Sequence, residues 1–148
     1  MTTGGEWFLD TNVLIAASAP ARGAHAQAVG LFAEAARTGR VLCTSAQVLR
    51  EYACVASRPL TGNGLGLDQQ KVRENLEQLG ARLRCLEEGR SVRLAWLTLL
   101  REVPLAGRQV HDANIAATMI AHGVHQLVTS NVADFLRFQP RISVVALG

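Results

Sequence analysis

Short apolar segments alternate with longer amphipathic segments along the whole chain, and this alternation constrains the fold more than any other feature. The short segments are typical of buried strands, whereas the longer ones repeat their apolar residues with a helical period. Strands are predicted at residues 7–9, 41–43, 83–86, 127–129 and 142–145. Helices are predicted at residues 13–19, 24–38, 46–57, 68–79, 91–103 and 112–122, with a helical turn at 131–138. Because strands joined through helices run parallel, we expect an α/β fold with a central parallel sheet of four to five strands and helices on both faces.

Chain length and cysteine usage bound the class of protein. The 148 residues, of which 49% are hydrophobic, fit a single domain over 1–148 and exclude a disordered chain. Cys43, Cys54 and Cys85 are odd in number and lack a CxxC spacing, so we expect buried, reduced thiols in a cytoplasmic protein. No signal peptide is expected at the N-terminus, and the longest strongly apolar run, at 94–100, is too short to span a bilayer.

Acidic residues stand at the junctions between predicted elements. The chain has only four aspartates, and three of them follow a strand or open a helix. Asp10 directly follows the first strand, Asp112 opens the apolar helix, and Asp134 comes soon after the fourth strand. Glu51 lies in the helix after the second strand. In a parallel sheet, binding sites lie beyond the carboxyl ends of the strands, so these side chains are candidates for one shared site.

Each acidic residue also has an ordinary structural explanation. Asp10 and Asp112 are well placed to cap helices, Glu51 alone is typical of a solvated helix face, and Asp134 alone is typical of a surface turn. Capping, however, does not explain why several carboxylates should share one edge of a sheet, where they repel each other and lose hydration. A divalent cation offsets both costs, and Mg²⁺ prefers such hard oxygen ligands.

Four segments together resemble the motifs of PIN-domain nucleases. Phe8-Leu9-Asp10-Thr11-Asn12 resembles the opening motif of that family, and Leu49-Arg50-Glu51-Tyr52 resembles the second. The segment 111–117, which contains Asp112, resembles the third motif, and the segment 127–135, which contains Asn131 and Asp134, resembles the fourth. The resemblance covers nearly the whole chain, in the order and spacing of the family. Within the family the chain is most similar to VapC-type toxins of bacterial toxin–antitoxin pairs.

The resemblance implies dependence on Mg²⁺ or Mn²⁺ and endoribonuclease activity on structured RNA. It further implies a cognate antitoxin that blocks the site, and a toxin homodimer. On this interpretation Asp10 and Asp112 hold the metal, and Glu51 holds a metal-bound water or helps to deprotonate it. Hydrolysis would leave a 5′-phosphate and a 3′-hydroxyl. Asn131 and Asp134 complete the acidic pocket.

One position departs from the family pattern, and two other functions stay open. The family often has aspartate where this chain has Asn131, which leaves a second metal in doubt. A phosphohydrolase could use Asp10 as a covalent nucleophile, but such enzymes usually need a carboxylate where this chain has Asn12. A non-catalytic module could bind RNA or protein through the same fold.

Arginines are the candidate RNA contacts. Fourteen of the fifteen basic residues are arginine, and the net charge of +3 suits an anionic partner without identifying one. The candidates for phosphate contacts are Arg22, Arg37, Arg40, Arg50 and Arg58.

Overall fold

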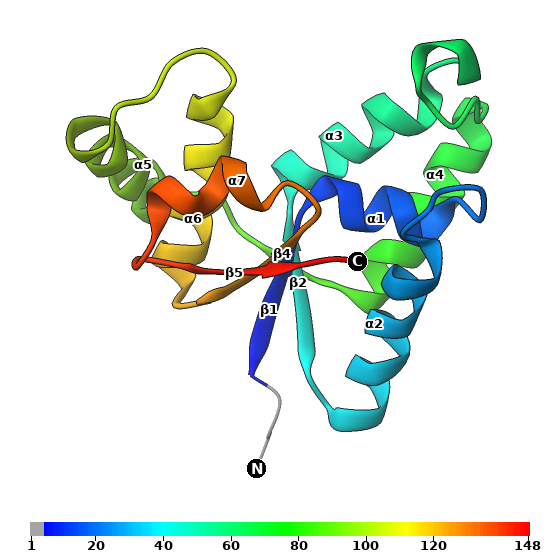
Figure 1. Cartoon of the computed structure of the whole chain (residues 1–148), viewed down its shortest axis with the longest axis horizontal. Helices are drawn as coiled ribbons and strands as arrows, with labels where there is room; N and C mark the ends of the chain where they lie inside the picture. The colour runs from blue at the N-terminus through cyan, green and yellow to red at the C-terminus, as the bar shows by residue number, and fades with distance from the viewer. Residues whose placement is uncertain (1–4) are drawn as a thin grey trace.

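A five-stranded parallel sheet with the order β3-β2-β1-β4-β5 organises the part of the chain that the computed structural model describes, residues 5–148 (Figure 1). The strands are β1 (Glu6–Leu9), β2 (Val41–Ser45), β3 (Arg84–Leu86), β4 (Gln126–Thr129) and β5 (Ser143–Ala146). The helices are α1 (Thr11–Ser18), α2 (His25–Thr38), α3 (Ala46–Ser57), α4 (Gln69–Arg82), α5 (Arg90–Glu102), α6 (Gln109–His122) and α7 (Val132–Phe135). Two short 3₁₀ helices are η1 (Leu60–Gly62) and η2 (Leu136–Phe138). The α/β fold with a parallel sheet of four to five strands is therefore confirmed.

The order of the strands reverses at β1. This strand pairs with β2 on one side, where Phe8 is in register with Cys43, and with β4 on the other, where Phe8 is in register with Leu127. Helices α1–α4 gather on one side of the strands and α5–α7 on the other (Figure 1). The carboxyl ends of β1 and β4 therefore lie next to each other at the topological switch point, the place where such sheets hold their sites.

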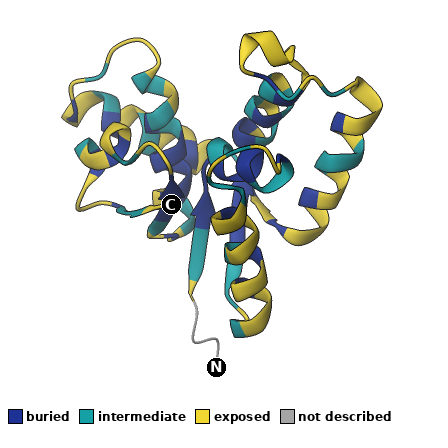
Figure 2. Ribbon diagram, turned by 45° about the vertical axis from the view of Figure 1, so that its right-hand side comes forward, coloured by how far each residue is buried: buried dark blue, intermediate teal, exposed yellow. Residues whose placement is uncertain are grey.

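The core lies between the sheet and the inner faces of both helix groups (Figure 2). Phe8, Leu127 and Tyr52 are fully buried, and β1 and β4 bury their carboxyl-terminal halves more completely than their beginnings. Helix α6 is buried on most of its circumference, as its apolar sequence predicts, although Ile120 is exposed. Because these elements are fixed by packing on two sides, the residues at their ends have little freedom to move.

The start of α6 differs from the prediction. The helix begins at Gln109, three residues before Asp112, because Gly107 adopts a left-handed turn (φ 57°) and the Gln109 side chain accepts a hydrogen bond from the Ala106 amide. Asp112 is therefore inside the first turn and does not cap the helix, so the capping explanation is wrong for this residue. Helix α4 also runs three residues further than predicted, through Gly80 to Arg82.

Two of the three cysteines also differ from the prediction. Only Cys43 is buried; Cys54, on α3, and Cys85, on the edge strand β3, are exposed free thiols. The segment 60–67 contains η1 and is held to the end of α3 by main-chain hydrogen bonds, one of them from the Gly66 amide to the Arg58 carbonyl. A Cβ at Gly64 would lie 2.2 Å from that carbonyl oxygen, so the close approach requires glycine.

A candidate metal-dependent active site

Asp10 stands at the switch point and has a dense shell of hydrogen-bond donors. Its amide continues the pairing of β1 with β4 through the Val128 carbonyl (3.0 Å), and its side chain caps α1 by accepting from the Thr11 amide (2.8 Å). The other carboxylate oxygen accepts from Asn12 Nδ2 (3.1 Å) and Thr129 Oγ1 (2.8 Å). The capping explanation of Asp10 is thus correct, but the cap uses only one of the two carboxylate oxygens.

Thr129 connects Asp10 to the segment that follows β4. Its hydroxyl is fully buried, donates to Asp10, and accepts from Asn12 Nδ2 (3.1 Å) and from the Asn131 amide (3.0 Å). The Ser130 amide donates to Asn12 Oδ1 (3.0 Å). These bonds fix the Asp10 carboxylate relative to the 130–134 segment.

Glu51 reaches the same edge of the sheet from α3. Its Oε2 accepts from Thr11 Oγ1 (2.7 Å), and its Oε1 accepts from Gln47 Nε2 (2.9 Å). Both donors are neutral, so Glu51 keeps its negative charge available to the site. That charge also acts on Asp10, whose pKa is raised mainly by burial, against the lowering effect of its hydrogen bonds.

Asp112 is the least compensated carboxylate of the site. Burial raises its pKa to about 6, and the negative charges of Asp134, Asp10 and Glu51 add to the increase, in that order, while Arg137 opposes them. Within residues 5–148 no hydrogen bond reaches its carboxylate, which is only partly exposed. The structure therefore brings together four predicted residues, Asp10, Glu51, Asp112 and Asp134, which we call the acidic cluster.

Asn131 and Asp134 form the exposed rim of this cluster. Asp134 is in the first turn of α7, and its amide donates to the Asn131 carbonyl (3.1 Å). The Asn131 side chain makes no capping bond to α7 and is exposed, so its amide oxygen is available to the site. Among the neighbouring carboxylates, Asp134 raises the pKa of Asp112 most, whereas Asn131 carries no charge.

The donor set of the acidic cluster fits a hard cation. All its side-chain ligands are oxygens, and a divalent cation would relieve the repulsion that raises the Asp112 pKa. In the described part of the chain, no three His, Cys, Asp or Glu side chains already stand at ligating distance from one another. Hard divalent cations such as Mg²⁺ take one or two direct carboxylates and keep several waters.

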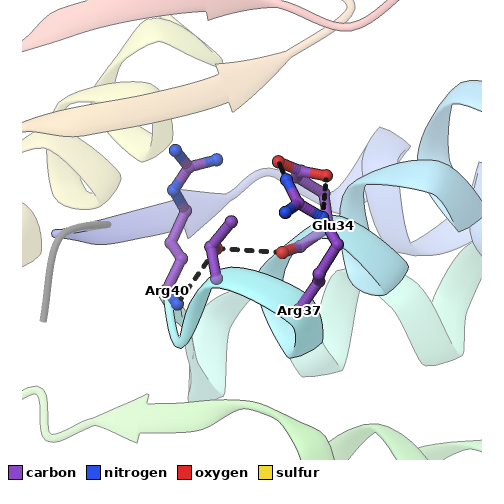
Figure 3. Close-up of polar contacts among 4 residues, drawn as sticks. Glu34, Arg37 and Arg40 are labelled. Atoms are coloured by element: carbon purple, nitrogen blue, oxygen red, sulfur yellow. Dashed lines mark hydrogen bonds and ion pairs between the residues drawn. The ribbon is translucent and has the colours of Figure 1, made fainter.

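Four of the five arginines proposed as RNA contacts have partners outside the cluster. Arg37 pairs with Glu34 at the end of α2 (Figure 3), and the Arg40 guanidinium lies 3.7 Å from the centre of the Trp7 ring. Arg22 donates to the Asn63 carbonyl and Arg58 to Cys54 Sγ, while Arg50 is exposed on α3. The basic residue that acts on Asp112 is Arg137, which the sequence reasoning missed.

Two surface cavities lie away from the acidic cluster. One, of about 510 Å³, is bordered by α2, α4 and the beginnings of β2 and β3, and the other, of about 460 Å³, lies between α5 and α6. Neither is lined by a residue of the cluster, so the polar contacts, and not the cavities, locate the candidate site.

Comparison with known proteins agrees with the motif analysis. The sequence matches the PIN domain family over residues 7–138, and no curated protein matches it. The fold is similar to VapBC2 from Rickettsia felis bound to promoter DNA (TM-score 0.68, 18% identity, 97% of this chain and 99% of that chain). It is also similar to VapBC-1 from Haemophilus influenzae (TM-score 0.67, 19% identity, 96% and 98% covered). A third similar structure is Mycobacterium tuberculosis VapC20, a toxin that cleaves the sarcin–ricin loop (TM-score 0.59, 22% identity, 82% and 86% covered). None of the described helices has the length and apolarity needed to cross a membrane.

Proposed function

The chain belongs to the PIN-domain family, and on that premise we propose that it is a Mg²⁺- or Mn²⁺-dependent endoribonuclease, the toxin of a type II toxin–antitoxin pair. The observation that carries the proposal is the uncompensated Asp112 carboxylate, which has no hydrogen-bond donor within residues 5–148 and faces the charges of three other carboxylates. A protein tolerates such repulsion where a bound cation balances it.

The residues of the acidic cluster have different roles in this proposal. Asp10 and Asp112 would hold the cation, and Glu51, fixed by Thr11 and Gln47, would hold a water or accept its proton. A bound Mg²⁺ or Mn²⁺ supplies the chemistry by lowering the pKa of a water and by stabilising charge on a phosphoryl oxygen. Asp134 adds negative charge at the rim, and the neutral Asn131 favours one cation over two.

The partners follow from the same proposal. The similar structures from R. felis and H. influenzae contain toxin–antitoxin pairs, which supports a cognate antitoxin here, and the cleavage of the sarcin–ricin loop by VapC20 supports a structured RNA as substrate. We further propose a homodimer that acts in the cytoplasm. The covalent phosphohydrolase loses support, because the side-chain NH₂ of Asn12 donates to Asp10 and Thr129 and offers no acid group.

Cleavage of RNA by matched aspartate variants tests the proposal. We expect Asp10→Asn and Asp112→Asn to lower the rate of cleavage in Mg²⁺ on the order of a hundredfold or more, because each removes a charged ligand but keeps the side-chain shape. Asp68→Asn is the control: Asp68 caps α4 through the Lys71 amide, outside the cluster, and asparagine caps equally well. Sequencing of the RNA ends identifies the cleavage site.

Two results would contradict the proposal. Full activity of pure Asp10→Asn protein on an RNA that the wild type cleaves would remove the acidic cluster from the reaction. The absence of any Mg²⁺ or Mn²⁺ binding in calorimetry would favour the non-catalytic binding module instead.

A further inference from the structure

A chain of neutral amides connects the acidic cluster to two other elements. Gln47 lies one turn before Glu51 on α3 and is buried, with 6% of its surface exposed. Its Nε2 donates both to Glu51 Oε1 (2.9 Å) and to the His111 carbonyl (3.0 Å), which directly precedes Asp112. One side chain therefore contacts the Glu51 carboxylate and the backbone that carries Asp112.

The orientation of the Gln47 amide is fixed from its other end. Asn114 Nδ2 donates to Gln47 Oε1 (2.7 Å) and to Glu88 Oε1 (2.8 Å). Glu88 Oε2 in turn accepts from the Gln47 main-chain amide (2.8 Å). If the Gln47 amide were flipped, its oxygen would face the Glu51 carboxylate and the His111 carbonyl, while its NH₂ would face the NH₂ of Asn114. The network thus allows only one orientation.

The donors that hold Glu51 are uncharged, and this matters for a cation site. Arginine or lysine at position 47 would hold Glu51 more strongly but would neutralise its charge and compete with a cation. Gln47 and Thr11 instead bind one carboxylate oxygen each and leave the charge in place. Such neutral hydrogen bonds are how outer groups orient metal ligands and tune the affinity of the site.

We propose that Gln47, held by Asn114 and Glu88, is a positioning residue that sets the separation of Glu51 from Asp112 in the proposed cation site. This inference rests on the proposed function, because it presumes a cation site in the acidic cluster. It goes beyond that function because it assigns a role in metal affinity to Gln47, Asn114 and Glu88. None of these three residues belongs to the acidic cluster.

Calorimetric titration with Mn²⁺ tests the inference without reference to RNA cleavage. Gln47→Met keeps the length of the side chain and removes the amide, and we expect it to weaken Mn²⁺ binding about tenfold or more. The matched control is Gln70→Met, because Gln70 also donates to a glutamate four residues later, Glu74 (3.2 Å), but on the exposed face of α4. Gln70→Met should bind Mn²⁺ with wild-type affinity.

A double-mutant cycle separates positioning from general support of the fold. If Gln47 acts through Glu51, then Gln47→Met should change the Mn²⁺ affinity less than twofold when it is introduced into Glu51→Gln protein. Equal losses in both backgrounds would show a role independent of Glu51 and would overturn the inference. Should Gln47→Met not fold, Asn114→Ala tests the same network by releasing the Gln47 amide, with the same expected loss of Mn²⁺ affinity.

The outcomes distinguish this inference from the proposed function. Wild-type protein that binds Mn²⁺, with Gln47→Met and Asn114→Ala variants that bind it equally well, overturns the positioning role and leaves the nuclease proposal standing. Wild-type protein that binds no Mn²⁺ overturns both.

Discussion

Asp10 and Asp112 belong to the same acidic cluster, but the protein surrounds them in opposite ways. Asp10 accepts hydrogen bonds from Thr11, Asn12 and Thr129, whereas within residues 5–148 no donor reaches Asp112, and three carboxylates repel it. Burial raises the pKa of both carboxylates, yet only Asp10 accepts hydrogen bonds from the described part of the protein. Asp10 is therefore part of the folded framework, whereas we propose that Asp112 is stabilised by a bound cation.

Metal-induced stabilisation should show the largest effect of this difference. A cation that binds only the folded protein stabilises it by about 2.7 kcal/mol at a concentration 100 times its Kd. We expect Mg²⁺ or Mn²⁺ to raise the Tm of the wild type, and the increase to be largely lost in Asp112→Asn. Thermal unfolding with added cation and with EDTA measures it, and Asp68→Asn should behave as the wild type. Equal stabilisation of Asp112→Asn would mean that the cation binds elsewhere.

The stability of the protein should depend on the hydrogen-bond donors around Asp10. Thr129→Val preserves the shape of the side chain but removes the hydroxyl that serves Asp10, Asn12 and the Asn131 amide. Because these buried groups lose a partner, we expect the free energy of unfolding to fall by about 2–3 kcal/mol in metal-free buffer. Urea unfolding gives the value. A loss below 0.5 kcal/mol would mean that the hydrogen bonds of the Thr129 hydroxyl contribute little to the stability of the fold.

Removal of the uncompensated charge should instead stabilise the metal-free protein. Asp112 has a folded-state pKa of about 6 against an ordinary value of 3.8. Folding therefore favours its protonated form, and the ionised form costs stability as the pH rises from about 4 to 6, fully so above 6. After allowance for solvent screening, we expect Asp112→Asn to be about 1 to 2 kcal/mol more stable than the wild type at pH 7.

The pH dependence provides the control for this third prediction. As the pH falls below 3.8, Asp112 becomes protonated in both the folded and the unfolded state, so the stability difference between wild type and variant should become small there. Urea unfolding of both proteins at intervals from pH 3.5 to 7.5, in EDTA, follows the difference. A constant difference across the range would show that it does not come from the carboxylate charge.

The contrast between the two aspartates was only partly predictable from the sequence. Strand ends and motif spacing indicated Asp10, Glu51, Asp112 and Asp134, because the order of residues along βα units determines which end of the sheet they reach. The compensation of each charge depends on contacts between distant segments: Thr129 is 119 residues from Asp10, and Asn114 is 67 residues from Gln47. Gln47 and Asn114 are neutral and Glu88 lies outside the four motif segments, so none of the three was indicated as a site residue. Only the four-residue spacing of Gln47 and Glu51 on one helix could have indicated the first of them.

Two buried threonines on β2 and β4 extend the comparison beyond the charged residues. Thr44 and Thr129 are both fully buried near the carboxyl ends of their strands. Thr129 has three partners, whereas the Thr44 hydroxyl has none among the described residues. Replacement of the two hydroxyls by methyl groups should therefore have effects of opposite sign.

Thr44→Val should produce the smallest effect, a gain of about 1 kcal/mol or less in the free energy of unfolding, because valine fills the same volume and removes an unpaired polar group from the core. Urea unfolding beside Thr129→Val measures both under the same conditions. The affinity for Mn²⁺ should stay that of the wild type, since Thr44 makes no bond to the acidic cluster. A loss of stability comparable to that of Thr129→Val would mean that a buried water pairs the Thr44 hydroxyl. Both threonine hydroxyls would then have a hydrogen-bond partner, and the two strands would differ only in whether that partner is protein or water.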